Sequence, residues 1–247
     1  MAISDILAVR ILEYVKEHEL SGNVVMLGRQ RWVGRRRKRS ADMFDKALAQ
    51  YLPGVSEDDL RNSDDAYSET FFRKIGFDQV DSMDISHFEN ASIVQDLGGE
   101  LPEELHGRFD VVYDGGTCEH IFDLPTAYRN IHKMLKPGGV LIGHSPCNNW
   151  INHGFYQICP EMVFGFWEKT LGYEVLECRL QPLLPMYAHR SIRPSNPNQT
   201  GVRPRIVGNL PNTSTILDYA VRKPAEEADG EVRVYQTDYE QRWQAAE

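Results

Sequence analysis

Short apolar runs alternate with amphipathic segments along most of this 247-residue chain, and this alternation indicates its class of fold. The apolar runs have the length of strands, whereas the segments between them have apolar residues at helical spacing. Strands that alternate with helices form a mostly parallel sheet that is covered by helices on both faces. The sequence therefore predicts an α/β fold with a Rossmann-like sheet of seven strands, expected at about 24–27, 79–84, 91–96, 109–113, 140–145, 173–180 and 214–223.

Capping and stop signals bound the helices that should cover this sheet. An N-terminal amphipathic helix has Ser4 as a candidate cap, and Ser40 and Thr126 are candidate caps of two later helices. Another helix is expected from about Asp65, and Pro160 stands at a first helical position, where proline is tolerated. The stop signals of these helices contain glycine and are Pro53-Gly54, Gly76, Pro137-Gly138 and Gly172.

The order of elements predicts a single domain over residues 1–224, followed by a charged tail at 225–247. The domain should contain an insertion at about 35–76 and a long connection at about 181–212. This connection is rich in Pro, Asn and Gly and is too long to be idle in a compact domain. It could close over a bound acceptor or join two subunits of a homodimer. In the tail, residues 232–235 could form an extra edge strand.

Composition and terminal sequence bear on the compartment. The chain has no run of about 18 apolar residues, so no membrane span is expected. Its N-terminus lacks the basic, apolar and small-residue order of a signal peptide. The four cysteines show no close spacing typical of a metal site, and reduced thiols are the simplest interpretation. We therefore expect a cytoplasmic protein.

The charge of the chain is unevenly distributed. Residues 29–39 hold seven Arg or Lys and no acid, so the rest of the chain has 20 basic and 36 acidic residues, a net charge of −16. Residues 57–69 hold six acids against one arginine. A nucleic-acid-binding protein usually presents a broader positive surface, so nucleic acid is not the expected partner. The basic run could instead bind an anion, or it could pair with the acidic segment.

Chemically distinctive residues fall where predicted strands end. Gly28, Asp84, Asp96, Asp114 and His144 each stand at the carboxyl end of a strand or directly after it. In an open parallel sheet these ends meet at one edge, and ligands bind there. The sequence therefore predicts that side chains far apart along the chain surround one ligand.

The stretch FDVVYDGGTCEHIFDLPTAYRNIHKMLKPGGVLIGHSP (109–146) resembles the centre of the class I S-adenosylmethionine-dependent methyltransferases. That family commonly has an FDxV strand, an EH pair at a helix start, and a helix that closes in LKPGGxL. The later HGFYQICPEMVFGFWEKTLGYEV (153–175) is similar to its post-sheet segment, and the resemblance spans about 24–180. It implies S-adenosylmethionine as the cofactor.

Roles for individual residues follow from this resemblance. It implies that Gly28 belongs to the glycine loop after the first strand. It implies that Asp84, followed by Ile85, accepts hydrogen bonds from the ribose hydroxyls, and a carboxylate is well suited to bind a diol. Asp96 and Leu97 are expected to border the adenine. The loop beside the methionine part of the cofactor should comprise Asp114, Gly115, Gly116 and Thr117.

The first glycine loop departs from the family pattern. Met26 stands where the family has an acid, and Gln30 and Trp32 replace two further glycines. Gly28 and Asp84 are also 56 positions apart, which leaves room for an inserted segment. We hypothesise that Arg29 or Arg31 compensates by pairing with the carboxylate of the cofactor, because guanidinium binds carboxylates through two parallel hydrogen bonds.

Catalysis of methyl transfer requires alignment of the acceptor and, for a hydroxyl acceptor, a base. Histidine titrates near neutral pH, and His144 and His153 are the leading candidates for this base. His120 is expected at the helix start after the fourth strand, where it would shape the cofactor pocket. The spacing of the three histidines matches no metal-ligand pattern, so no metal is expected. Side chains suited to a polar, sugar-like acceptor are Asn148, Asn149 and Tyr156.

The sequence thus predicts an enzyme that transfers a methyl group to oxygen or nitrogen of a small polar acceptor, sugar-like or anionic. The altered first loop leaves a second interpretation, a catalytically silent protein that binds a cofactor or metabolite and acts as a partner or regulator. A third is an RNA-directed methyltransferase that uses the basic run at 29–39.

Overall fold

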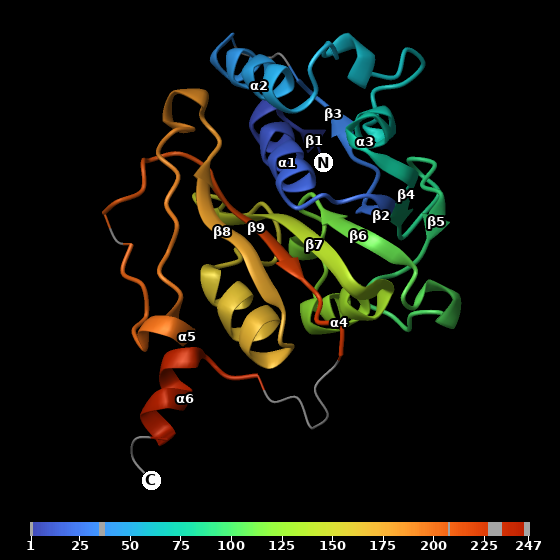
Figure 1. The fold of residues 1–247 in the computed structure, drawn as a ribbon. Helices are drawn as coiled ribbons and strands as arrows, with labels where there is room; N and C mark the ends of the chain where they lie inside the picture. The colour runs from blue at the N-terminus through green and yellow to red at the C-terminus, as the bar shows by residue number, and fades with distance from the viewer. Residues whose placement is uncertain (1, 35–37, 207, 227–233, 245–247) are drawn as a thin grey trace.

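A computed structural model describes residues 2–34, 38–206, 208–226 and 234–244, and Figure 1 shows the fold. A seven-stranded sheet forms its centre, in the order β5-β4-β2-β6-β7-β9-β8. Strand β9 runs opposite to the other six strands and is antiparallel to both of its neighbours, β7 and β8. The other pairs of neighbouring strands in this sheet are parallel. The predicted α/β class with a mostly parallel sheet is confirmed. The strands are β2 (Gly22–Leu27), β4 (Phe77–Asp84), β5 (Ile93–Val94), β6 (Phe109–Asp114), β7 (Leu135–Asn148), β8 (Glu174–Pro182) and β9 (Thr215–Arg222).

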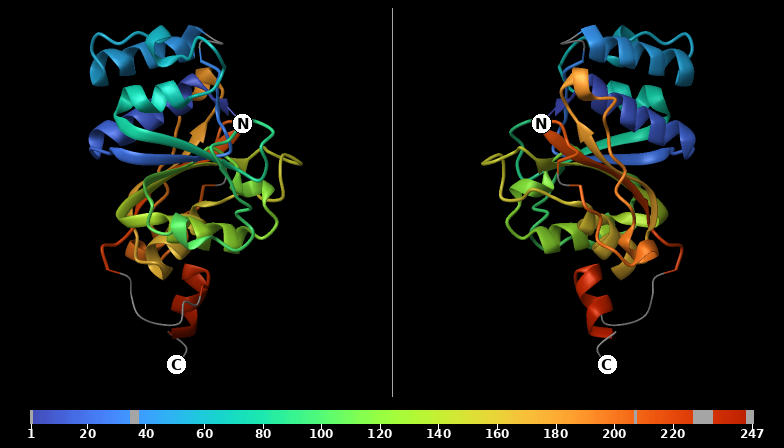
Figure 2. Two further views of the ribbon diagram at one scale, coloured as in Figure 1. Left: turned by 90° about the vertical axis from the view of Figure 1, so that its right-hand side faces the viewer. Right: turned by 90° about the vertical axis from the view of Figure 1, so that its left-hand side faces the viewer.

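Helices cover both faces of the sheet, as Figure 2 shows. Successive side chains of a strand point to opposite faces. Accordingly, Val24 and Met26 of β2 join one apolar core with the first three helices, whereas Val25 and Leu27 join a second core on the other face. The first face is covered by α1 (Asp5–Glu17), α2 (Lys38–Tyr51) and α3 (Glu69–Ile75), and the second by α4 (Leu124–Met134) and the π-helix η4 (Met162–Thr170).

The predicted insertion packs against the N-terminal helix. The indole of Trp32 lies between the rings of Phe44 and Phe71, at centroid distances of 5.5 and 4.8 Å. Trp32 therefore belongs to the core of the insertion and does not approach a ligand. Two short strands that the sequence did not indicate, β1 (Ala2–Ile3) and β3 (Arg31–Trp32), pair in parallel beside it. The remaining short elements are η1 (Asp58–Leu60), η2 (Glu103–Leu105), η3 (Cys118–His120), η5 (Pro185–Tyr187), α5 (Pro197–Thr200) and α6 (Thr237–Gln244).

Two of the three predicted caps, Ser40 and Thr126, are wrong, whereas Ser4 does stand at the N-cap position of α1. Ser40 lies inside α2, and its hydroxyl donates to Asp5 at 2.7 Å. The backbone of Ser4 precedes α1, but its side chain makes no capping bond. Asp123 caps α4 by accepting from the backbone N–H of Thr126, because that N–H is one of those left without a partner in the first turn. Helix α3 begins at Glu69, later than expected. Asp65, the expected start, lies before the helix and forms an ion pair with Arg29.

The connection leaves β8 at its carboxyl end, Pro182, and the chain re-enters the sheet at Thr215, which pairs with Asn148 at the end of β7. The connection, orange in Figure 1, runs beside β8 and η4. There, Asn196 donates to Glu168 at 2.8 Å. Tyr235 lies in no strand, and the positions 232 and 233 of the expected edge strand fall outside the described residues. The sequence did not predict α6, whose Thr237 donates to Glu161. None of the described helices is long and apolar enough to cross a membrane.

Candidate functional site

A cavity of about 320 Å³ lies at the carboxyl ends of the parallel strands. The chain passes from β2 to β4 and β5 in one direction and then to β6 and β7 in the other, so the strand order reverses at β2. Such a reversal opens a crevice at the strand ends, where α/β proteins bind ligands. The residues that line it are Gly28, Gln30, Met83, Asp84, Ile85, Glu89, Gln95, Asp96, Leu97, Gly116, Thr117, His120 and Ile121.

The loop after β2 is held in place by its neighbours. Gly28 has φ +67°, which favours glycine, and its N–H donates to Met83 on β4 at 2.7 Å. The Leu27 carbonyl accepts from Thr117 Oγ1 at 2.7 Å and from Gln30 Nε2 at 2.8 Å. The buried Gln30 side chain therefore stabilises this loop from within and also lines the cavity. From the sequence, Gln30 could be described only as the replacement of a glycine of the family loop.

The two acids predicted to bind the nucleoside lie on one side of the cavity. Asp84 ends β4 and is half-buried, and its Oδ1 accepts from the Ser86 N–H at 3.3 Å. Asp96 follows β5 and is exposed, and its Oδ1 accepts from the Gly98 N–H at 2.8 Å. Both carboxylates retain acceptor capacity toward the cavity, because a carboxylate has about four lone-pair sites.

Asp114 and Gly115 do not line this cavity. The Asp114 side chain is buried, and its Oδ1 accepts from the N–H groups of Gly116 at 3.1 Å and Thr117 at 2.7 Å. Gly115 packs so closely that an added Cβ would lie 2.8 Å from the Gln30 side chain. The two residues shape the loop after β6, and Gly116 and Thr117 face the cavity.

Arg29 is occupied within the fold. Its Nε lies 2.6 Å from Glu69, its Nη2 lies 3.1 Å from Asp65, and its guanidinium stacks on Tyr67 at 3.9 Å. This arrangement matches the alternative in which the basic run pairs with the acidic segment. Arg31 is more than half exposed and lies 3.4 Å from Glu89. Neither arginine lines the cavity, and positions 35–37 of the run lie outside the described residues.

His144 is buried on the face of the sheet that α1 covers. It shares that face with Val140 and Ile142, because alternate residues of β7 point the same way. Its Nδ1 lies 3.0 Å from the Tyr113 hydroxyl, and its Nε2 lies 3.2 Å from Asp218. The imidazole is about 1% exposed and does not line the cavity, so it lacks the access that a catalytic base needs.

His120 and His153 meet at the opposite side of the cavity from Asp84. Their ring centroids are 5.1 Å apart. The Nε2 atoms of His120 and His153 lie 3.7 and 3.6 Å from the same oxygen of the buried Glu119. Glu119 follows the loop after β6, and burial together with the charge of Asp114 raises its pKa to about 8. Sequence reasoning did not single out Glu119, although the EH pair after DGGT marked the position.

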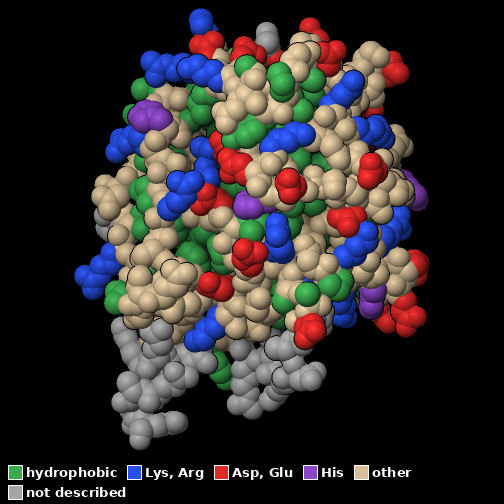
Figure 3. Space-filling model, in the orientation of Figure 1, with side chains coloured by type: hydrophobic (Ala, Val, Ile, Leu, Met, Phe, Trp, Pro, Cys, Tyr) green, Lys and Arg blue, Asp and Glu red, His purple; other side chains and the backbone are tan. Residues whose placement is uncertain are grey.

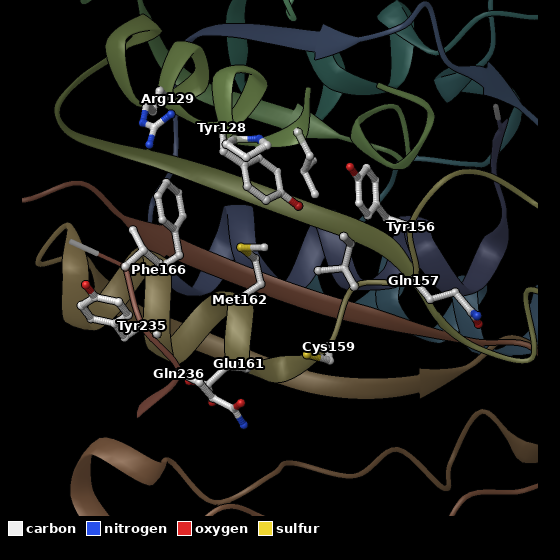
Figure 4. A pocket seen from close by; sticks show the side chains of 15 residues that line it. Tyr128, Arg129, Tyr156, Gln157, Cys159, Glu161, Met162, Phe166, Tyr235 and Gln236 are labelled. Atoms are coloured by element: carbon white, nitrogen blue, oxygen red, sulfur yellow. The ribbon is translucent and has the colours of Figure 1, made fainter. Parts of the chain in front are cut away.

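The residues predicted to bind the acceptor do not converge on the cavity. Asn148 ends β7, and Asn149 donates to the Thr213 carbonyl at 3.0 Å. The Tyr156 hydroxyl donates to the Phe122 carbonyl at 2.7 Å. Tyr156 instead lines a second cavity of about 660 Å³ between α4 and η4, mainly apolar and shown in Figure 4. The polar groups at the strand ends favour the smaller cavity as the candidate site.

On the face shown in Figure 3, the charges of the described residues give no support to a nucleic-acid interface. On this face, Lys and Arg side chains are interspersed with Asp and Glu. No continuous basic area is visible there among the described residues. Binding to a polyanion normally requires such an area. The two arginines nearest the strand ends, Arg29 and Arg31, are paired with acids.

Comparison with known proteins finds similarity to methyltransferases over part of the chain. Residues 73–177 match a family model described as a methyltransferase domain. The match covers the chain from α3 into β8 but omits β2 and the altered first loop. Over 73 residues the chain is 33% identical to phosphoethanolamine N-methyltransferase 1 of Triticum aestivum. That alignment covers 30% of this chain and only 13% of the wheat protein.

Solved structures of similar topology include two N-methyltransferases with bound S-adenosylhomocysteine. One is NodS from Bradyrhizobium japonicum WM9, at 13% identity and TM-score 0.42, covering 87% of this chain and 85% of NodS. The other is the 1,6-didemethyltoxoflavin-N1-methyltransferase of Burkholderia thailandensis, at 13% identity and TM-score 0.44, covering 89% and 80%. Both likenesses are too distant to indicate a substrate. The family match agrees with the resemblance that the motifs suggested: residues 73–177, somewhat less than half of the chain, are similar to a methyltransferase domain.

Proposed function

We propose that the chain transfers a methyl group from S-adenosylmethionine to an oxygen or nitrogen of a small polar acceptor. The observation that carries this proposal is the cavity at β2, where Asp84 and Asp96 stand on one side and the loop of Gly116 and Thr117 on the other. Its volume of about 320 Å³ lies within the range of roughly 300–1,000 Å³ usual for small-molecule sites.

The residues of this cavity fit the cofactor. Asp84 can accept from both hydroxyls of a ribose, and the exposed Asp96 carboxylate can accept from an adenine amino group. Ile85 and Leu97 provide apolar surface beside them. On the other side, Thr117 and the positive-φ Gly28 and Gly116 leave room for an amino-acid chain close to the backbone. When bound, the cofactor supplies a methyl group that is already activated by its sulfonium charge.

The two sides of the cavity also determine which way the cofactor would point. With the nucleoside toward β4 and β5, the methionine part lies toward β6, which is the side of Glu119, His120 and His153. An acceptor would enter there, and these polar side chains can hold and orient it. Of the two histidines predicted as bases, the proposal keeps His153 at the acceptor side, next to His120, which was expected to shape the cofactor pocket. It assigns His144 to the buried core.

A transfer assay tests the proposal against its alternatives. The protein is incubated with methyl-labelled S-adenosylmethionine and a cell extract, and the extract is then separated into metabolites, RNA and protein. We expect the label in the metabolite fraction. The double variant Asp84→Asn/Asp96→Asn should abolish the transfer, because both nucleoside acceptors lose their charge.

Each other outcome contradicts the proposal in a distinct way. Label in RNA that is lost on ribonuclease treatment would indicate the RNA-directed alternative. Tight binding of S-adenosylhomocysteine in calorimetry, without transfer to any fraction, would indicate a catalytically silent protein. Failure to bind either form of the cofactor would exclude the site itself.

A further inference from the structure

Three side chains with metal-binding atoms meet at the open side of the cavity. Glu119 and His120 belong to η3, and His153 belongs to the loop that follows β7. One atom from each, a carboxylate oxygen and two imidazole nitrogens, lies within 4.8 Å of the other two. His120 also lines the cavity, so the group borders the space where an acceptor would lie.

The Glu119 side chain is an independent indication of a cationic ligand. It is fully buried, and neither carboxylate oxygen has a hydrogen-bond donor among the described residues. Its nearest polar neighbours are the two imidazoles at 3.6 and 3.7 Å, beyond hydrogen-bond distance. Burial of a carboxylate without hydrogen-bond donors costs several kcal/mol, and either protonation of the group or a bound cation removes this cost.

The loop that supplies His153 is fixed over Glu119. The Phe155 N–H donates to the Glu119 carbonyl at 2.8 Å. Gly154 approaches so closely that an added Cβ would lie 2.8 Å from the same carbonyl oxygen. The ring of Trp150 packs against that of His153 at a tilt of 60°, with centroids 4.7 Å apart, and its Nε1–H donates to the Thr215 carbonyl at 2.9 Å. His153 is thus held toward Glu119 by backbone contacts and packing, which keeps the donor atoms together.

We propose that Glu119, His120 and His153 bind a divalent transition-metal ion such as zinc, cobalt or manganese. Two histidines and one glutamate form a ligand set of catalytic zinc sites, which keep a further position open. Tetrahedral bonds of about 2.0–2.1 Å would separate the donors by about 3.4 Å. The two observed separations from the Glu119 oxygen, 3.6 and 3.7 Å, are close to this value, and all three donors lie within 4.8 Å of one another. Two imidazole ligands disfavour magnesium and calcium, which prefer oxygen.

The open position of such an ion would face the acceptor side of the cavity. There the ion would act as a Lewis acid that orients and polarises the oxygen or nitrogen of the acceptor. The role of the ion as a Lewis acid rests on the proposed function, but metal binding itself does not. The sequence did not predict the site, because His120 and His153 are 33 positions apart and their spacing matches no known ligand pattern.

Cobalt(II) provides a direct test, because imidazole and carboxylate ligands in tetrahedral geometry intensify its visible absorption. The full chain, stripped with a chelator, is titrated with cobalt(II). We expect a visible band that saturates at one ion per chain and that zinc displaces. Glu119→Gln and His153→Ala should each weaken binding by more than about 100-fold, because loss of even an outer-shell partner typically costs 10–100-fold. His106→Ala removes an exposed histidine away from the cluster and should leave binding unchanged.

The proposal is overturned if the wild-type protein gives no saturable band, or if Glu119→Gln and His153→Ala both bind cobalt like His106→Ala. His153→Ala keeps the test informative if Glu119→Gln does not fold, which circular dichroism would reveal. Calorimetry with S-adenosylhomocysteine separates the two proposals. If the protein binds S-adenosylhomocysteine but fails to bind cobalt, only the metal site is refuted. If it binds cobalt but fails to bind S-adenosylhomocysteine, the cofactor site is refuted.

Discussion

Asp84→Asn is the most direct test of the nucleoside side of the cavity. Asp84 ends β4 half-buried, and among the described residues only the Ser86 N–H donates to it, at 3.3 Å. Asparagine has nearly the same shape, so the strand and the turn at Ser86 should persist. The substitution removes the charge and converts one of the two acceptor oxygens into a donor.

The expected loss of affinity follows from the bonds to a ribose diol. A hydrogen bond to a charged group contributes about 1.5–3 kcal/mol. Asparagine would lose one such bond outright and the charge assistance of the other. Because Asp84 is only half-buried, the total should lie near the lower end, at about 2 kcal/mol, which corresponds to a roughly 30-fold increase in Kd.

Isothermal titration calorimetry with S-adenosylhomocysteine measures this change. Asp81→Asn is a matched control, because Asp81 lies on the same strand but pairs with Arg108 at 3.3 Å and does not line the cavity. We expect its Kd to stay within about twofold of the wild type. A folded Asp84→Asn variant that binds as tightly as wild type would refute the assignment of Asp84 to the ribose. Equal losses in both variants would refute it as well.

Four further predictions follow from the structure. His144→Ala should lower the free energy of unfolding by about 3 kcal/mol, because it breaks the buried pair of His144 and Asp218. The affinity for the cofactor should not change. A urea unfolding curve that shows unchanged stability would contradict this prediction. Burial acts to raise the pKa of Asp218, but the His144 hydrogen bond and nearby charge hold it below its ordinary value. Stability should therefore be present at neutral pH and fall as the pH drops through the folded pKa, and Asp218→Asn should flatten this acid loss in unfolding curves. Arg29→Ala should cost about 1–3 kcal/mol in the same measurement, since its acidic partners lose their charge-assisted bonds. Iodoacetamide should label the exposed Cys159 well before Cys147, whose pKa burial raises to about 12; equal rates by peptide mass spectrometry would be inconsistent with this.

Local signals predicted most of the elements. The apolar runs, the helical spacing and the glycine stops placed all seven strands of the sheet and the five larger helices that cover it. Failures occurred where the outcome depended on distant partners. The β1–β3 pair has only two residues in each strand, which is too short for a periodic signal. Ser40 bonds to Asp5, 35 positions away, so its neighbours in sequence gave no indication of its role.

The candidate site divides in the same way. Asp84, Asp96 and Gly28 could be recognised because each directly follows a strand, and parallel strands end at one edge. The cluster of Glu119, His120 and His153 could not, because it depends on a loop after β7 that returns over η3. The sequence did not indicate that Arg29 pairs with Asp65 and Glu69, because these partners lie about 40 positions further along the chain. Arg29 was therefore a candidate for the carboxylate of the cofactor.

By itself the sequence determined the alternation of strands and helices and the acids at the strand ends, because periodicity, glycine and proline act within a few residues. Tertiary structure decided which of the chemically active side chains could meet. Strand order put β4 and β6 on either side of β2 and so opened the cavity. Because side chains alternate along β7, His144 points into the core. The chain returns after β7 and so brings His153 close to Glu119. In both cases the surroundings of the side chain depend on pairing and packing across the whole fold.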